Sequence, residues 1–190
     1  MNLSNYPRCP ATWATSLHRG FTLVELLIVV AIMAILAALA GPSFTGTIDR
    51  YRVSTTIDQL AAALTLVRIE AIKRSGNVGI ARLSGGDCPT LGTAQEWTCG
   101  WQVFVDTNGN GVQNVGEATI QQFRVTNGIT VINNTGGTGF SANRWGQING
   151  LGALSFSISP ESGVASPATT AICLSTGGRI RKIPNTTVCP

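Results

Sequence analysis

The chain has 190 residues, of which 44% are hydrophobic and 12% charged, and its formal net charge is +4. This balance excludes a disordered chain and allows one domain with its own core plus an appended segment. The acidic residues are scattered, and the sequence has neither a glycine-rich phosphate loop nor a serine-centred elbow, so we expect no enzyme and no cofactor. The single histidine, His18, precedes a long apolar run. A chain cleaved at that run would therefore lack histidine-based triads and most zinc sites.

The first element is this apolar run, "RGFTLVELLIVVAIMAILAALAGPSF", at residues 19–44. About 20 predominantly apolar residues are enough to cross a bilayer as a helix. A cleaved secretory signal and an ordinary signal anchor both have such a run behind a basic flank. Neither explains Glu25, because burying a carboxylate in hydrocarbon costs about 3 kcal/mol or more.

The same residues resemble the class III signal of type IV prepilins: a short basic leader ends in Gly20, Phe21 follows, and Glu25 is the fifth residue after the cut. The resemblance implies that a prepilin peptidase removes the leader, residues 1–20, and that Phe21 is N-methylated. It also implies that residues 21–45 form a single-pass inner-membrane helix beneath a periplasmic domain, and later part of the core of an extracellular pilus. We expect Glu25 to pair with the new amino group of Phe21, in its own chain or a neighbour, and so to set the stagger of subunits during assembly.

The next segment, residues 46–76, has the pattern of an amphipathic helix. Gly41-Pro42 before it predicts a kink or local unwinding. Lys73 and Arg74 followed by Gly76 form a stop signal, so we expect one long helix from about Phe21 to Ser75 whose second half packs on a sheet. The apolar residues at helical spacing, which we expect to be buried, are Phe44, Ile48, Tyr51, Ile57, Leu60, Leu64, Val67 and Ala71.

Residues 77–190 read as a β-rich globular domain, because short alternating runs are separated by glycine and asparagine turns. The fold class expected is α+β, with a long N-terminal helix packed on a mostly antiparallel sheet. The expected strands are "VGIARL", "GWQVFVD", "TIQQFRV", "ITVI", "LSFSI" and "AICLS", and the aromatic residues available for the core are Trp97, Trp101, Phe104, Phe123, Trp145 and Phe156.

Four of the five cysteines lie in this domain, and the fifth, Cys9, lies in the leader. An even number in an exported domain suggests two disulfides, and three connectivities are open. The one that closes the shortest loops pairs Cys88 with Cys99 and Cys173 with Cys189. Buried free thiols or a tetrathiolate metal site are the alternatives, although no CxxC spacing occurs.

Residues 106–117, "DTNGNGVQNVGE", satisfy the spacing of a calcium-binding EF-hand loop, with Asp106, Asn108, Asn110 and Glu117 at ligand positions. The flanking segments read as strands, however, whereas an EF-hand loop joins two helices. We therefore expect a hairpin with a long Asn-Gly turn and no metal site.

The C-terminal stretch "CLSTGGRIRKIPNTTVC", residues 173–189, contains Arg179, Arg181 and Lys182 and no acidic residue. If it is extended, Arg179 and Arg181 project to the same side roughly 7 Å apart, close to the phosphate spacing of one nucleic-acid strand. Two glycines before them would let the backbone approach a ligand, and a bridge between the flanking cysteines would hold the loop as one unit. The spacing alone favours a plainer structure, a solvated edge strand whose charges oppose aggregation.

The long helix, the stretch "GWQVFVDTNGNG" and this ending together resemble the FimT and FimU minor pilins and the GspH pseudopilins over nearly the whole mature chain. In that family the GRxR pattern, here Gly178-Arg179-Ile180-Arg181, is associated with FimT-type subunits that bind DNA during natural transformation. The resemblance implies a subunit that assembles with other pilins and binds double-stranded DNA without sequence preference through Gly178, Arg179, Arg181 and Lys182. A FimU-like structural subunit that primes pilus assembly and a GspH-like pseudopilin of type II secretion are the alternative functions.

Overall fold

The computed structural model describes residues 20–86, 88, 92–148 and 152–190, and of residues 38–44 it describes the backbone alone. The leader, including Cys9 and His18, therefore lies outside the described residues. The chain forms two compact units, Met1–Gly41 and Pro42–Pro190. Helix α1 (Leu23–Lys73) runs through both, and it stays α-helical across Gly41 and Pro42. The expected local unwinding at this point is therefore wrong.

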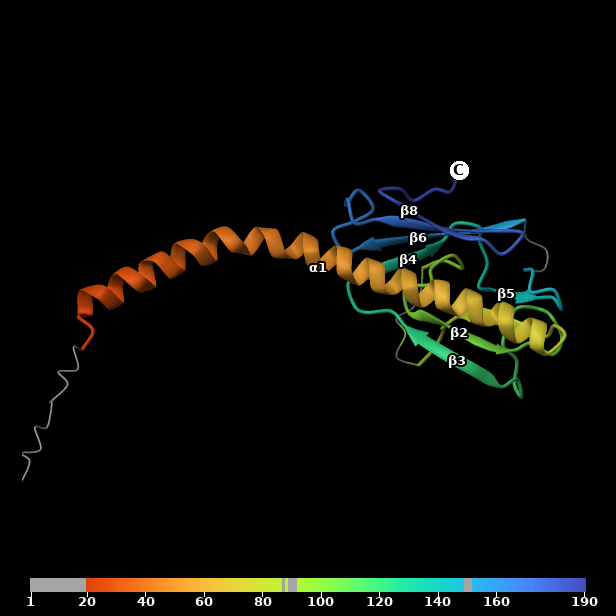
Figure 1. Cartoon of the computed structure of the whole chain (residues 1–190). Coiled ribbons are helices and arrows are strands. Elements are labelled where there is room, and N and C mark those ends of the chain that lie inside the picture. The colour runs from red at the N-terminus through yellow and green to blue at the C-terminus, as the bar shows by residue number, and fades with distance from the viewer. Residues whose placement is uncertain (1–19, 87, 89–91, 149–151) are drawn as a thin grey trace, which may run out of the picture. The chain divides into compact units, whose positions relative to one another are not determined.

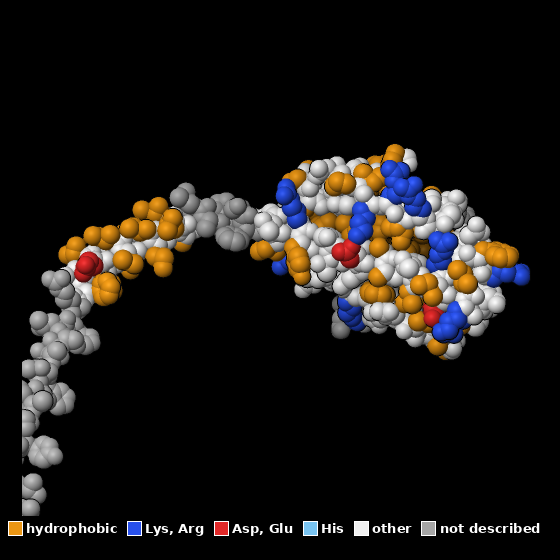
Figure 2. Space-filling model, viewed as in Figure 1, with side chains coloured by type: hydrophobic (Ala, Val, Ile, Leu, Met, Phe, Trp, Pro, Cys, Tyr) orange, Lys and Arg blue, Asp and Glu red, His pale blue; other side chains and the backbone are white. Residues whose placement is uncertain are grey.

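In the first unit, α1 is apolar on all sides. The side chains from Phe21 to Leu36 are largely exposed, and Glu25 is the one acidic group among the described residues of this stretch. Figure 2 shows the result as an apolar rod with one acidic side chain near its start. Within the part of the chain that the structure describes, no helix combines the length and the hydropathy needed to cross a bilayer.

The second unit packs the rest of α1 between two four-stranded antiparallel sheets (Figure 1). The first sheet has the order β3-β2-β1-β5, and the second has the order β4-β6-β7-β8. The strands are β1 (Val78–Arg82), β2 (Gly100–Val105), β3 (Thr119–Arg124), β4 (Ile129–Asn133), β5 (Gly139–Ala142), β6 (Ala153–Pro160), β7 (Thr170–Ser175) and β8 (Ile180–Pro184). The α+β fold with an antiparallel sheet structure is confirmed.

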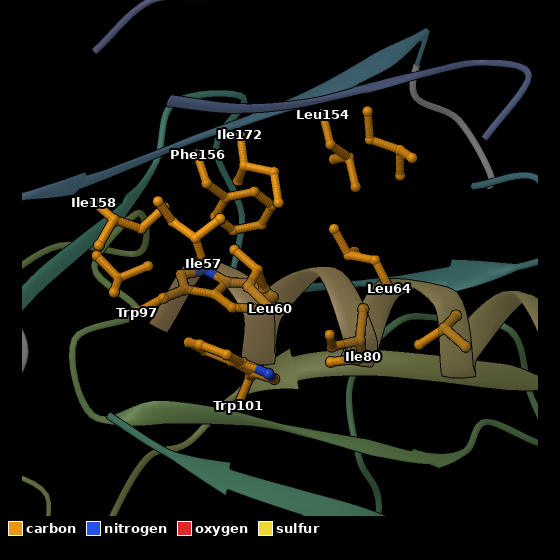
Figure 3. Packing of buried hydrophobic residues seen from close by; sticks show 14 of the residues in the cluster. Ile57, Leu60, Leu64, Ile80, Trp97, Trp101, Leu154, Phe156, Ile158 and Ile172 are labelled. Atoms are coloured by element: carbon orange, nitrogen blue, oxygen red, sulfur yellow. The ribbon is translucent and has the colours of Figure 1, made fainter. Parts of the chain in front are cut away.

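The core lies where α1 meets both sheets (Figure 3). Trp97 stacks on Phe140 with ring centroids 5.7 Å apart and meets Phe156 edge-on at 5.1 Å. From the helix, Leu60 is fully buried, and burying a side chain of this kind contributes about 1.5–3 kcal/mol. The core cluster and both disulfides of the described residues lie between Val53 and Cys189, so the Pro42–Pro190 unit has its own core and cross-links, as expected of a unit that folds by itself.

Three expected core residues are exposed instead. Ile48 and Tyr51 of α1 are 46% and 73% exposed, and the core face of the helix includes Val53 and Ala63 in their place. Trp145, in the loop between β5 and β6, is 70% exposed. The expected burial of these three is therefore wrong, because apolar character alone does not bury a residue.

A candidate nucleic-acid interface at the C-terminal hairpin

The candidate site is the hairpin of β7 and β8, at the edge of the second sheet. The strands pair with Leu174 opposite Ile180 and Cys173 opposite Arg181. The ladder continues to the turn, where the N–H of Ser175 donates to the carbonyl of Arg179 at 3.0 Å. A second bond joins the N–H of Gly178 to the carbonyl of Ser175 at 2.8 Å, which gives a tight three-residue turn. The basic loop is therefore a hydrogen-bonded hairpin with a tight turn.

Gly178 occupies the one position of this turn with a left-handed backbone, at φ +81°. A Cβ at this position would lie 2.2 Å from Nη1 of Arg68. Arg68 comes from α1, so the helix places a further guanidinium directly against the tip of the hairpin. Gly178 is thus favoured by the left-handed turn and lies against Arg68, which gives it a structural role within the predicted binding set.

Arg179 and Arg181 lie on the face of the hairpin that is turned away from α1. Arg181 pairs with Cys173, whereas the alternate residues of β7, Ile172 and Leu174, belong to the core. Both arginines are exposed, and among the described residues neither forms an ion pair. Two alternate positions of a strand are roughly 7 Å apart, so the extended backbone gives Arg179 and Arg181 the spacing expected from the sequence.

Lys182 is separated from this pair, because it lies on the opposite face of β8. It stands opposite Ile172, and its Nζ donates to Oδ1 of Asp58 on α1. The hairpin therefore presents two cations outward and uses the third to contact the helix.

The segment after β8 is fastened to the same sheet by a disulfide between Cys173 and Cys189, and a second disulfide joins Cys88 to Cys99. These are the two pairs with the shortest loops. The side-chain amide of Asn134 also donates to the carbonyl of Thr187 at 2.8 Å. The tail thus crosses the sheet between two attachment points.

The loop that matches the EF-hand spacing joins β2 to β3 as a hairpin. Asp106 is fully buried, and its carboxylate accepts hydrogen bonds from the backbone N–H of Asn110 at 3.1 Å and of Gly111 at 2.8 Å. Asn108 accepts a bond from the N–H of Asn110 as well. Both residues therefore stabilise the turn, and among the described residues no group of three or more His, Cys, Asp or Glu could hold a metal ion.

At the other end of the same loop, Glu117 accepts hydrogen bonds from the N–H groups of Asn114 and Thr107, both at 2.8 Å. The bond from the Asn114 N–H is the largest effect, and it lowers the pKa of Glu117 below the ordinary value of 4.5 against the opposing effect of burial. This carboxylate is thus engaged in closing the hairpin.

Glu25 has partners within its own chain. Its carboxylate accepts from the N–H and the hydroxyl of Thr22, both at 2.9 Å, and the Thr22 hydroxyl accepts from the Glu25 N–H at 3.2 Å. This reciprocal pair is a capping box at the start of α1. Gly20 and Phe21 precede it and are exposed.

Comparison with known proteins then identifies the family. The profile described as "Type II transport protein GspH" matches residues 56–183, about two thirds of the chain, from the buried half of α1 to β8. The chain belongs to the GspH family. A second profile, the prokaryotic N-terminal methylation motif, matches residues 15–41, which include Gly20, Phe21 and Glu25.

Individual proteins agree with this assignment. The pilin-like protein PilA1 of Thermus thermophilus is 28% identical over 172 residues, which is 87% of this chain and 92% of that protein. The type IV major fimbrial protein FimA of Dichelobacter nodosus is 44% identical over 79 residues, and this match spans 42% of each chain. Two crystal structures of the type IV minor pilin FimU from Pseudomonas aeruginosa share the fold, with 17% and 18% identity and TM-scores of 0.52 and 0.54. They cover 70% and 72% of this chain, and 93% and 91% of their own.

This member of the GspH family, with its N-terminal methylation motif, is therefore a pilin-like or pseudopilin-like protein. Sequence reasoning missed Arg68 at its hairpin, because 110 positions separate Arg68 from Gly178 and no local pattern connects them. The capping box, by contrast, was detectable from the Thr-x-x-Glu spacing alone.

Proposed function

We propose that this chain is a FimT-like minor pilin that binds duplex DNA without sequence preference, through Arg179 and Arg181, during natural transformation. The single observation that carries the proposal is the outward placement of these two arginines on a hydrogen-bonded hairpin, with no acidic partner among the described residues. Two cations at strand spacing on one face of the hairpin can contact successive phosphates of one strand. Contacts to phosphates carry no sequence information, so binding that rests on them is non-specific.

Two phosphate contacts predict weak binding with a shallow salt dependence. The logarithm of the association constant should fall by about 1.8 for each tenfold rise in salt, at roughly 0.9 per contact. Figure 2 shows basic side chains spread over the visible face of the globular unit and few acidic ones beside them, which adds a weak attractive background.

The experiment is fluorescence anisotropy of the Pro42–Pro190 unit with labelled duplexes of unrelated sequence, over a range of salt concentrations. The double substitution Arg179→Gln, Arg181→Gln should abolish most binding and flatten the salt slope by about 2. The matched control is Arg50→Gln, Arg124→Gln, which removes the same charge from exposed positions elsewhere. Equal binding by the two double variants would refute the assignment of the hairpin.

The family profile gives the alternative of type II secretion a specific basis, because its printed description names type II transport. A strain that lacks this gene separates the alternatives. Loss of DNA uptake with normal pili and normal secretion supports the proposal, loss of pili supports a FimU-like assembly role, and loss of protein secretion supports a pseudopilin.

We also propose that the chain matures as type IV pilins do. A prepilin peptidase would cut after Gly20, Phe21 would be methylated, residues 21–45 would anchor the subunit in the inner membrane, and the subunit would then enter an extracellular pilus with other pilins. The match of the methylation motif to residues 15–41 supports this sequence of steps. Mass spectrometry of the assembled subunit should find N-methylated Phe21 as its first residue.

The role proposed for Glu25 in assembly can be separated from its role in the capping box. Glutamine preserves a capping box but carries no charge, whereas alanine removes both functions. If the charge pairs with a neighbour's Phe21 amine, Glu25→Gln subunits should enter filaments as poorly as Glu25→Ala subunits do. Normal assembly of the Glu25→Gln subunit would leave only the capping role.

A further inference from the structure

Trp145 is an exposed aromatic residue in the loop between β5 and β6, and hydrogen bonds fix the backbone turn that carries it. Oδ1 of Asn143 accepts from the backbone N–H groups of Trp145 at 2.9 Å and of Gln147 at 3.0 Å. The N–H of Gly146 donates to the carbonyl of Asn143 at 2.8 Å, and Gly146 adopts φ +71°. The exposure of this indole, 70%, is therefore a property of an ordered turn.

Arg68 connects this turn to the hairpin. A Cβ on Gly146 would lie 2.5 Å from Cγ of Arg68, and a Cβ on Gly178 would lie 2.2 Å from its Nη1. The two glycines thus flank a single arginine side chain, and they also line a common hollow of about 180 Å³. The apolar members of its lining are Leu64, Ile148, Leu174 and Ile180.

Arg68 lines this hollow, and Arg144 and Arg179 lie within two residues, along the sequence, of its lining glycines Gly146 and Gly178. Among the described residues, Arg68, Arg144 and Arg179 form no ion pair. From position 139 to the C-terminus the sequence has one acidic residue, Glu161. Glu161 follows the end of β6 that is remote from the hairpin tip, beside Gly128. An exposed indole next to Gly146, an apolar lining that contains no carboxylate, and guanidinium groups that form no ion pair among the described residues are the components of a site for a nucleobase and its phosphate.

We propose that Trp145, Arg68 and the tip of the β7–β8 hairpin form a stacking site for an unpaired nucleotide, so that the chain binds single-stranded DNA more tightly than closed duplex. The proposal rests on the DNA binding proposed above and assigns a second mode to it. In a duplex the faces of the bases are covered by their neighbours, so the indole has no partner. An unpaired strand can place one base on the indole while its phosphates follow Arg68 and Arg179.

Intrinsic fluorescence tests this directly. In the Pro42–Pro190 unit the other tryptophans, Trp97 and Trp101, are fully buried, so a ligand that stacks on an exposed indole quenches Trp145 alone. Oligo-dT should quench the fluorescence of Trp145. A duplex of equal length, with both ends closed by loops of a non-nucleotide linker, should not quench it. Trp145→Ala should weaken oligo-dT binding by about 5- to 150-fold and change closed-duplex binding less than twofold, and Trp145→Phe should retain most of the affinity.

The matched control is Tyr51→Ala, because Tyr51 is an aromatic residue of α1 that is 73% exposed. This substitution should change neither the affinity for oligo-dT nor that for the closed duplex. Equal affinity of Trp145→Ala and the unaltered protein for oligo-dT would overturn the proposal, and so would equal quenching by both nucleic acids. In either case duplex binding that still depends on Arg179 and Arg181 would leave the proposed function intact. Loss of self-association in the Trp145→Ala variant, with unchanged oligo-dT binding, would assign the indole to a subunit contact instead and would also overturn the proposal.

Discussion

Replacing Gly178 by alanine should destabilise the globular unit, whereas the same change at the neighbouring Gly177 should not. Gly178 has φ +81°, and a left-handed backbone costs a residue with a Cβ roughly 1–2 kcal/mol. The new methyl group would also displace the guanidinium of Arg68, but Arg68 is exposed and flexible, so this part of the cost is small. The expected loss in the free energy of unfolding is therefore about 1–2 kcal/mol.

Gly177 is the matched control. No atom lies within 4 Å of a Cβ built on it, and its φ is outside the left-handed region. Alanine there should leave stability unchanged or raise it by about 0.4–1 kcal/mol, because it restricts the unfolded chain.

Thermal unfolding of the Pro42–Pro190 unit, followed by circular dichroism, measures the difference. For a domain of this size, 1 kcal/mol corresponds to about 2–4 °C, so Gly178→Ala should lower Tm by roughly 2–8 °C. Equal Tm values for the two alanine variants would refute the argument that the turn requires Gly178.

Three further predictions concern the same unit. Replacing Cys173 and Cys189 together by serine should lower the free energy of unfolding by about 3 kcal/mol in urea titrations, since the bridge spans 16 positions, and a loss below 1 kcal/mol would contradict the loop-closure estimate. Lys182→Gln removes an exposed ion pair, so the free energy of unfolding should fall by less than about 1 kcal/mol. Its duplex affinity should fall less than that of the Arg179→Gln, Arg181→Gln variant. An equal fall in affinity would show that Lys182 also contacts DNA. The lowered pKa of Glu117 stabilises the fold above pH 4.5, and this contribution is lost as the pH falls through the folded-state pKa. The Tm advantage of the unaltered protein over Glu117→Gln should therefore shrink below pH 4.5, and a constant difference would exclude this titration.

Periodicity predicted most of the fold, because strands such as β1 and β2 alternate and lie between strong turn residues. β5 was missed, since "GFSA" contains a single large apolar residue and its pairing with β1 is non-local. The buried face of α1 was predicted correctly from Ile57 onward and wrongly at Tyr51, because Tyr51 lies on the other side of the helix from the buried Val53.

The site was predictable only in part. The charges of Arg179, Arg181 and Lys182 were visible in the sequence, but their division between two faces of β8 depends on the register with β7. Strand alternation places Lys182 on the other face of β8 from Arg181. Its hydrogen-bond partner, Asp58, is 124 positions away in the sequence. Contacts of this kind arise from tertiary packing and leave no local pattern.

The disulfide between Cys173 and Cys189 also has a mechanical consequence. β8 is an edge strand that pairs, among the described residues, only with β7. A force on Arg179 or Arg181 would break the hydrogen bonds between the two strands one after another. The cross-link encloses the whole of β8 in a covalent loop. Tension applied to either arginine passes along the main chain into β7, which has strands on both sides, while the cross-link keeps the segment after β8 attached to β7. A ligand held by this hairpin could be pulled without stripping the tail from the subunit.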